Sequence, residues 1–127
     1  MKNIIRSAKH LNFIRKQPCI ITGEKGEACH IRILSDGGTS IKPSDFYCIS
    51  LHTDLHRQQH YLGEISFYQK WSINPFTIAK NLVTMSDCKK VNTKTIIHLL
   101  DERAKTYGRI YQNIESDTQS PSTKQKR

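Results

Sequence analysis

The chain has 127 residues and a hydrophobic content of 36%, enough for one compact domain with a small core. Its 20 Lys and Arg exceed its 11 Asp and Glu, for a formal net charge of +9, so polyanions are the expected partners, nucleic acid first and an anionic membrane surface second. Since no apolar run reaches the roughly 18 residues of a membrane-spanning helix and no secretory signal is readable, we expect a cytoplasmic protein with reduced cysteines.

The first half of the chain predicts one helix and two strands. Residues 4–16 mix apolar with basic side chains and stop before a proline, as a short basic helix would. Residues 28–34 alternate as a strand, and residues 35–40 (SDGGTS) are typical of a loop. Residues 46–51 are rich in aromatic and β-branched types, which favours a second strand.

The second half predicts helices. One begins near Thr53 and ends at Gly63, and another follows over residues 64–71. Asn74-Pro75 is a start signal for the next helix, and residues 93–111 place apolar side chains at 3–4 spacing. The polar C-terminal tail is expected to be disordered.

Three histidines, His52, His56 and His60, are spaced by four residues. Each step of four turns a helix by about 40°, so His56 and His60 share a face and could bind one metal ion. The residue after His56 is Arg57, so the zinc-protease motif HExxH is absent. Ordinary solvated or core-edge histidines show the same spacing, and both interpretations stay open.

A second candidate pair is Cys29-His30, on the first predicted strand. Adjacent strand residues face opposite ways, so both reach one site only at a bend or a strand end. There, one residue could bind a metal while the other deprotonates water. Cys48 and Cys88 lie in apolar surroundings and are expected to be buried small side chains.

Four segments together resemble the phage-type HNH nucleases, among them the RecA-dependent nuclease and related phage recombination nucleases. They are HLNFIRKQPC, ACHIR, SDGGTSIKPSDFYCISLHTDLHRQQH and YLGEISFYQKW, and the likeness in order and spacing covers residues 10–82. The resemblance implies an α+β fold, a ββα-metal (His-Me finger) core with flanking N- and C-terminal helices. The expected parts are a basic helix (1–17), the HNH-like core (18–74), a helical extension (75–113) and the polar tail (114–127).

The resemblance also implies the residues of a metal-dependent active site. The catalytic base falls on His30, and the residue that holds it falls on Asp45. The metal ligands fall on Cys29, His56 and His60, and the cofactor is a divalent ion, zinc or magnesium or manganese. Because thiolates bind zinc well and magnesium poorly, Cys29 either favours zinc or does not coordinate, which would weaken the site.

Further positions follow from the same resemblance. Arg32, Lys42 and Arg57 are expected along the path of the DNA phosphates. The structural zinc site of these nucleases falls on Cys19, Thr22, His52 and Leu55. Only Cys19 and His52 could still bind zinc, so we expect this site to be degenerate.

Three functions are compatible with these features. The first is a metal-dependent DNA endonuclease with little sequence specificity, acting in phage recombination or DNA processing, with DNA and a recombination protein as partners and no membrane. The second is a catalytically degenerate DNA-binding module of prophage origin. The third is a small zinc-binding protein without nucleic-acid function. Net charge does not separate the first two, because phosphate binding is common to both.

Overall fold

The computed structural model describes residues 4–86 and 93–112, and over these residues the protein is α+β, as predicted. No helix in this part of the chain is long and apolar enough to cross a membrane. The elements are α1 (Ala8–Arg15), β1 (Glu27–His30), β2 (Cys48–Leu51), α2 (Thr53–Leu62), α3 (Glu64–Lys70), α4 (Pro75–Ser86), α5 (Thr93–Tyr107) and a π-helical turn, η1 (Gly108–Gln112).

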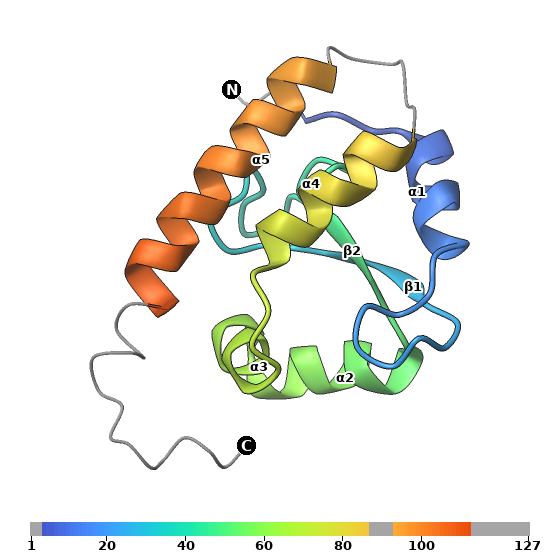
Figure 1. Ribbon diagram of the computed structural model, residues 1–127, viewed down its shortest axis with the longest axis vertical. Helices are drawn as coiled ribbons and strands as arrows, with labels where there is room; N and C mark the ends of the chain where they lie inside the picture. Colours follow the sequence, from blue (N-terminus) through green and yellow to red (C-terminus); the bar gives the residue numbers. More distant parts are fainter. Residues whose placement is uncertain (1–3, 87–92, 113–127) are drawn as a thin grey trace.

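The two strands pair antiparallel, with Cys29 opposite Ile49 and His30 opposite Cys48. In Figure 1 this hairpin runs through the middle of the molecule, with α1, α4 and α5 above it and α2 and α3 below. All four residues of β2 are buried. A two-stranded sheet is marginal by itself, so the helices on both sides supply most of the burial that keeps it folded.

The strands are shorter than predicted. The backbone leaves β1 after His30, and the amides of Arg32 and Ile33 donate to the Glu64 carboxylate instead of to a strand. Leu34 then adopts a left-handed conformation, with φ +55°. The predicted strand 28–34 therefore ends early because a side chain, not a neighbouring strand, satisfies the backbone of its second half.

Helix ends follow the signals in the sequence more closely. The Asn74 side chain accepts from the Phe76 amide at 3.1 Å and caps α4, and Gly63, with φ +91°, ends α2. Ser7 caps α1 by accepting from the His10 amide, so the helix begins later than predicted. The residues before it are extended: the Asp45 amide donates to the Ile5 carbonyl at 2.8 Å.

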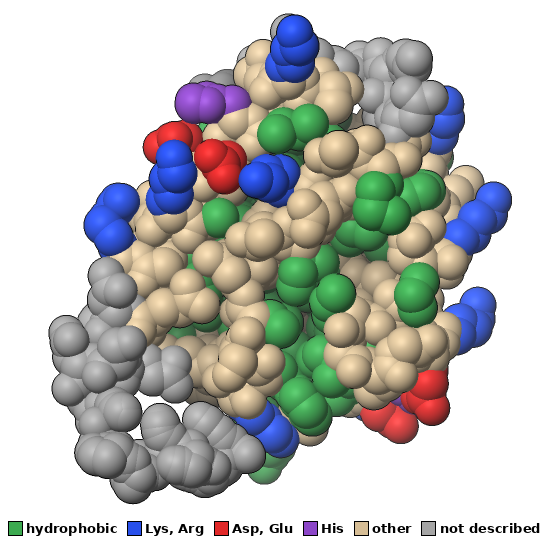
Figure 2. Space-filling view, viewed as in Figure 1, with side chains coloured by type: hydrophobic (Ala, Val, Ile, Leu, Met, Phe, Trp, Pro, Cys, Tyr) green, Lys and Arg blue, Asp and Glu red, His purple; other side chains and the backbone are tan. Residues whose placement is uncertain are grey.

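The main core joins the hairpin to α2, α3, α4 and α5, and α1 packs on the hairpin and α4 through a second, smaller cluster. The segment 75–113, expected as an extension, contributes Phe76, Ala79, Val83, Ile96, Leu100 and Tyr107 to it. Cys48 is fully buried with Ile14 and Leu82, as predicted. Figure 2 shows hydrophobic side chains over the middle of one face, around α4, with Lys and Arg near its edges. Cys88 and the predicted tail 114–127 lie outside the described residues.

Candidate functional site

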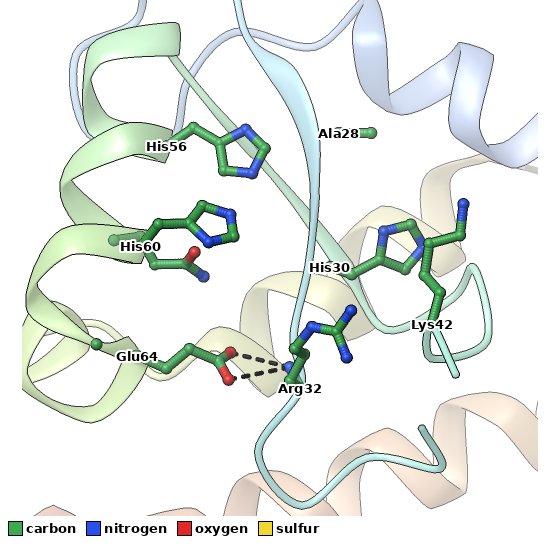
Figure 3. Close-up of a pocket in the computed structure, with 9 residues that line it drawn as sticks. Ala28, His30, Arg32, Lys42, His56, His60 and Glu64 are labelled. Carbon is green, nitrogen blue, oxygen red and sulfur yellow. Dashed lines mark hydrogen bonds between the residues drawn. The ribbon is translucent and has the colours of Figure 1, made fainter. Parts of the chain in front are cut away.

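A pocket between β1 and α2 brings together five of the ten predicted site residues. In Figure 3, His56 and His60 project from α2 toward β1, and His30 and Lys42 lie on the far side of that strand. The pocket is lined by Ala28, His30, Arg32, Lys42, His56, Gln59, His60, Gly63 and Glu64. Three imidazoles and two cationic side chains therefore face one solvent-accessible space.

The two helical histidines have the spacing of a shared metal site. Their ring centroids are 5.1 Å apart. Two imidazoles that bind one ion at about 2.1 Å in a near-tetrahedral arrangement have centroids roughly 5 Å apart. His56 is half-buried and His60 is exposed, so an ion held between them would remain open to water and to substrate.

Glu27, which the sequence did not single out, orients His56. Its carboxylate accepts from His56 Nδ1 at 2.9 Å and from the Thr53 hydroxyl at 2.7 Å. The hydrogen bonds from Thr53 and then from His56 lower the pKa of Glu27. Because Nδ1–H donates to the carboxylate, Nε2 of His56 keeps its lone pair for a metal ion.

His30 is paired with Asp45, as the resemblance implied. Its Nε2 lies 3.0 Å from Asp45 Oδ1, and the two side chains are 14% and 4% exposed. A carboxylate only accepts, so Nε2 donates and Nδ1 is left as the basic nitrogen. Burial lowers the pKa of His30, although Asp45 partly offsets this, and the ring is neutral near pH 7. A neutral, oriented imidazole can take a proton from water.

Asp45 is itself held by the segment before α1. It accepts from the Ser7 amide at 2.8 Å and from Arg6 Nη1 at 3.2 Å. Burial alone raises the pKa of Asp45, but the hydrogen bonds from Ser7, His30 and Arg6 outweigh it and lower the pKa overall. The Arg6 guanidinium also donates to the carbonyls of Lys42, at 2.7 Å, and Pro43. Arg6 thereby holds the loop that contains Lys42 next to Asp45.

Cys29 is not brought into the pocket. It is 1% exposed and packs in the main core, on the face of β1 opposite His30. Burial, more than the neighbouring Cys48 and Glu64, raises the pKa of its thiol well above the usual range, so the sulfur is protonated. A buried thiol with this orientation is not available to an ion between His56 and His60, and the expected zinc preference loses its basis.

The three predicted phosphate contacts divide between two adjoining depressions. Arg32 and Lys42 line the pocket itself. Arg57 lines a neighbouring depression with Glu27, Thr53 and both helical histidines, and its guanidinium lies 3.4 Å from Asp54. All three are exposed and near the histidines.

Glu64 is a second carboxylate at the pocket, and the sequence predicted no role for it. It accepts from the amides of Arg32 and Ile33, at 2.9 and 3.0 Å, and from the Tyr68 hydroxyl at 2.8 Å. It fixes the end of β1 against the start of α3. In the sequence, Glu64 stands out only as part of the segment YLGEISFYQKW.

The four positions of the expected zinc site carry other interactions. Cys19 accepts from the amides of Ile21 and Thr22 at 3.4 Å each. Burial raises the pKa of its thiol, but hydrogen bonds from Thr22, the His52 amide and Ile21 lower it overall. His52 caps α2 by accepting from the Asp54 amide at 3.2 Å, and Leu55 is buried in the core. Hydrogen bonds and packing hold this loop.

Among residues 4–86 and 93–112, no group of three or more His, Cys, Asp or Glu side chains is arranged to hold a metal ion. His56 and His60 are the part of the expected ligand set that the fold assembles in the pocket. Two imidazoles fit one ion and would leave its other positions to water and substrate oxygen.

No curated protein and no solved structure matches the chain. Residues 2–86, from the segment that anchors Asp45 through α4, match the family described as "Protein of unknown function (DUF968)". Since the match covers more than half of the chain, the protein belongs to the DUF968 family.

Proposed function

We propose that this protein is a metal-dependent endonuclease with a ββα-metal core, which hydrolyses phosphodiester bonds in DNA with little sequence specificity. One observation carries the proposal: a base candidate, a histidine pair and two cations line the same pocket. Phosphodiester hydrolysis needs these groups together, to deprotonate water and to neutralise charge that develops on the phosphate. A phage recombination or DNA-processing context remains part of the proposal and rests on the resemblance.

His30 would act as the general base. Asp45 holds Nε2, so Nδ1 accepts the proton of an attacking water while a new P–O bond forms. The bond from phosphorus to the leaving oxygen breaks, and that oxygen takes a proton from solvent. Burial keeps the pKa of His30 below its usual value, so the base is unprotonated at neutral pH.

His56 and His60 would hold the divalent ion, zinc or magnesium or manganese. When bound, such an ion acts as a Lewis acid on the phosphate. Glu27 keeps the Nδ1 proton of His56, which leaves Nε2 free for coordination. Arg32 and Lys42 would bind the non-bridging oxygens and align the phosphate with His30.

The direct test is nicking of supercoiled plasmid with Mg, Mn, Zn, Co or Ni. We expect His30→Ala to lower the nicking rate on the order of 10²-fold or more, since a general base contributes at least that much. Binding of duplex DNA in EDTA should stay within a few-fold. His98→Ala, an exposed histidine on α5, is the matched control and should nick normally. If the wild type nicks with none of these metals, the enzyme proposal is refuted.

A second candidate is a DNA-binding module that has lost catalysis. The burial of Cys29 favours it, because the residue at the position of the third ligand points into the core. This module would bind duplex DNA with a steep salt dependence but leave plasmid intact with every metal. A zinc-binding protein without nucleic-acid function would instead show no DNA affinity at about 50 mM salt, where phosphate contacts are strong.

A further inference from the structure

Arg15, Lys16 and Lys25 form a second basic cluster, away from the histidines. They line a depression with Gln17, Pro18, Gly23 and Glu24, at the end of α1 and in the loop that leads to β1. We propose that one DNA backbone is held along a continuous groove, from Lys42 across His56 and His60 to this basic cluster. The proposal rests on the proposed function for the identity of the polyanion, but not for catalysis.

The first half of the groove is continuous because two depressions share their walls. His56 and His60 line both the pocket that contains His30 and Lys42 and the neighbouring depression that contains Arg57. The histidine pair thus forms a ridge between the two depressions. A DNA strand that lies over this ridge would contact the residues of both depressions.

The second half is joined by two short links. Along the chain, Lys25 of the basic cluster is two residues from Glu27, which lines the middle depression. Across space, His52 Nε2 lies 3.5 Å from Oε1 of Glu24, which lines the same depression as the basic cluster. The residue after His52, Thr53, lines the middle depression. The basic cluster therefore adjoins the middle depression at the start of α2.

The charges along this path favour a polyanion. The three depressions contain six cationic side chains, Arg15, Lys16, Lys25, Arg32, Lys42 and Arg57, against three carboxylates. Each carboxylate is engaged within the protein: Glu27 by His56, Glu64 by backbone amides, and Glu24 by His52. Figure 2 shows Lys and Arg along the edge where Figure 1 places α1 and the following loop.

The distance suits one duplex. His30 is five positions after Lys25 in the chain, which corresponds to at most about 17 Å in an extended conformation. Duplex DNA rises about 3.4 Å per base pair, so roughly five base pairs would bridge the scissile phosphate and the basic cluster. A single short duplex can contact both ends of the groove.

The test measures binding of a duplex of about 20 base pairs in EDTA, by fluorescence anisotropy over a range of salt. The variant is Lys16→Gln/Lys25→Gln, and the charge-matched control is Lys9→Gln/Lys94→Gln, whose lysines line none of the three depressions. We expect the variant to bind on the order of ten-fold more weakly near 0.1 M salt, with a salt slope smaller by about two. The control should bind as the wild type does.

A third variant tests continuity. If one duplex spans the groove, the fold-losses of Lys42→Gln and of Lys16→Gln/Lys25→Gln multiply in the combined variant, and the stoichiometry stays one to one. Two duplexes per wild-type protein, falling to one of unchanged affinity in Lys16→Gln/Lys25→Gln, would mean two separate patches and would overturn the proposal. Equal losses in variant and control, no loss in either, or wild-type binding to anionic vesicles but not to duplex would also overturn it. None of these outcomes depends on cleavage. A protein that binds DNA in this way but does not cleave it would refute the proposed nuclease activity and would still support the proposed groove.

Discussion

The Nδ1 atom of His56 lies 2.9 Å from Oε1 of Glu27, so a residue of β1 fixes a ring on α2. The same carboxylate accepts from Thr53 in the first turn of that helix. Two contacts from one side chain thus set both the position of α2 on the strand and the tautomer of the histidine. Glu27 therefore couples the placement of α2 to the orientation of His56.

We expect Glu27→Gln to weaken divalent-metal binding by about 10–100-fold, because the partner of a metal-binding histidine sets its orientation and basicity. Isothermal titration with Zn or Mn gives the affinity. Glu102→Gln, an exposed residue on α5, is the control. Loss of metal affinity with an unchanged far-UV spectrum and melting temperature separates this role from a purely structural one. Unaltered affinity in Glu27→Gln would show that the carboxylate does not orient His56 for a metal.

For the proposed nuclease activity, the pairing of Asp45 with His30 predicts a shift in the pH profile of cleavage. The Asp45 hydrogen bond and charge raise the pKa of His30, against the burial that lowers it. Asp45→Asn removes the charge, so the pKa of His30 falls further and the acidic limb of kcat/KM moves to lower pH. The plateau rate should drop on the order of 10²-fold, because the ring is no longer held as a base.

Rates of plasmid nicking between about pH 5 and 8, around the ordinary histidine pKa, give both quantities. Asp101→Asn on α5 should leave the profile in place. An acidic limb that stays put or moves upward in Asp45→Asn would argue against His30 as the titrating base.

Arg6 is expected to position both Asp45 and the Lys42 loop. Arg6→Ala removes the guanidinium that bonds Asp45 and the Lys42 and Pro43 carbonyls, and we expect the cleavage rate to fall roughly ten-fold. Arg6→Lys keeps the charge but not the fork of donors, so it should restore only part of the rate. Arg109→Ala, an exposed arginine in η1, is the control. Full activity in Arg6→Ala would show that Arg6 is not needed to position Asp45 and that the hydrogen bond from the Ser7 amide is sufficient.

The helix ends and the shared face of His56 and His60 could be predicted from the sequence, because interactions between residues close in the chain determine them. Asn74 and Gly63 mark helix ends by side-chain capping and by a left-handed φ, and both act within a few residues. The spacing of four between His56 and His60 sets a common face on any helix. Their place in the pocket with His30 follows once α2 packs beside β1.

The rest depends on contacts between distant segments. Arg6 and Ser7 reach Asp45 across 38 or 39 residues, and hydrogen bonds between irregular segments leave no periodic pattern. Glu64 shortens β1 by binding amides that alternation alone assigns to a strand. For Cys29 the alternation of the strand was the better guide: it places Cys29 and His30 on opposite faces, whereas the resemblance placed both in one site.

Outside the pocket, His10 predicts a pH dependence of stability. Its side chain is buried, Nδ1 lies 2.9 Å from Ser86 Oγ, and the ring stacks on Phe13. Burial lowers the pKa of His10, although Asp45 opposes this. The folded pKa is therefore below the ordinary value of about 6.5, and the unfolded chain binds the proton more readily.

It follows that the stability His10 contributes is complete above about pH 6.5 and is lost as the pH falls through its folded pKa. Urea unfolding between about pH 7.5 and 5 should show a slope of at most about 1.4 kcal/mol per pH unit from this group. His10→Gln should flatten that slope, whatever its absolute stability, whereas the exposed His98→Gln should keep it. His30 is present in both variants, so its own contribution cancels in the comparison. An equal slope in the two variants would mean that proton uptake at His10 is not part of acid destabilisation.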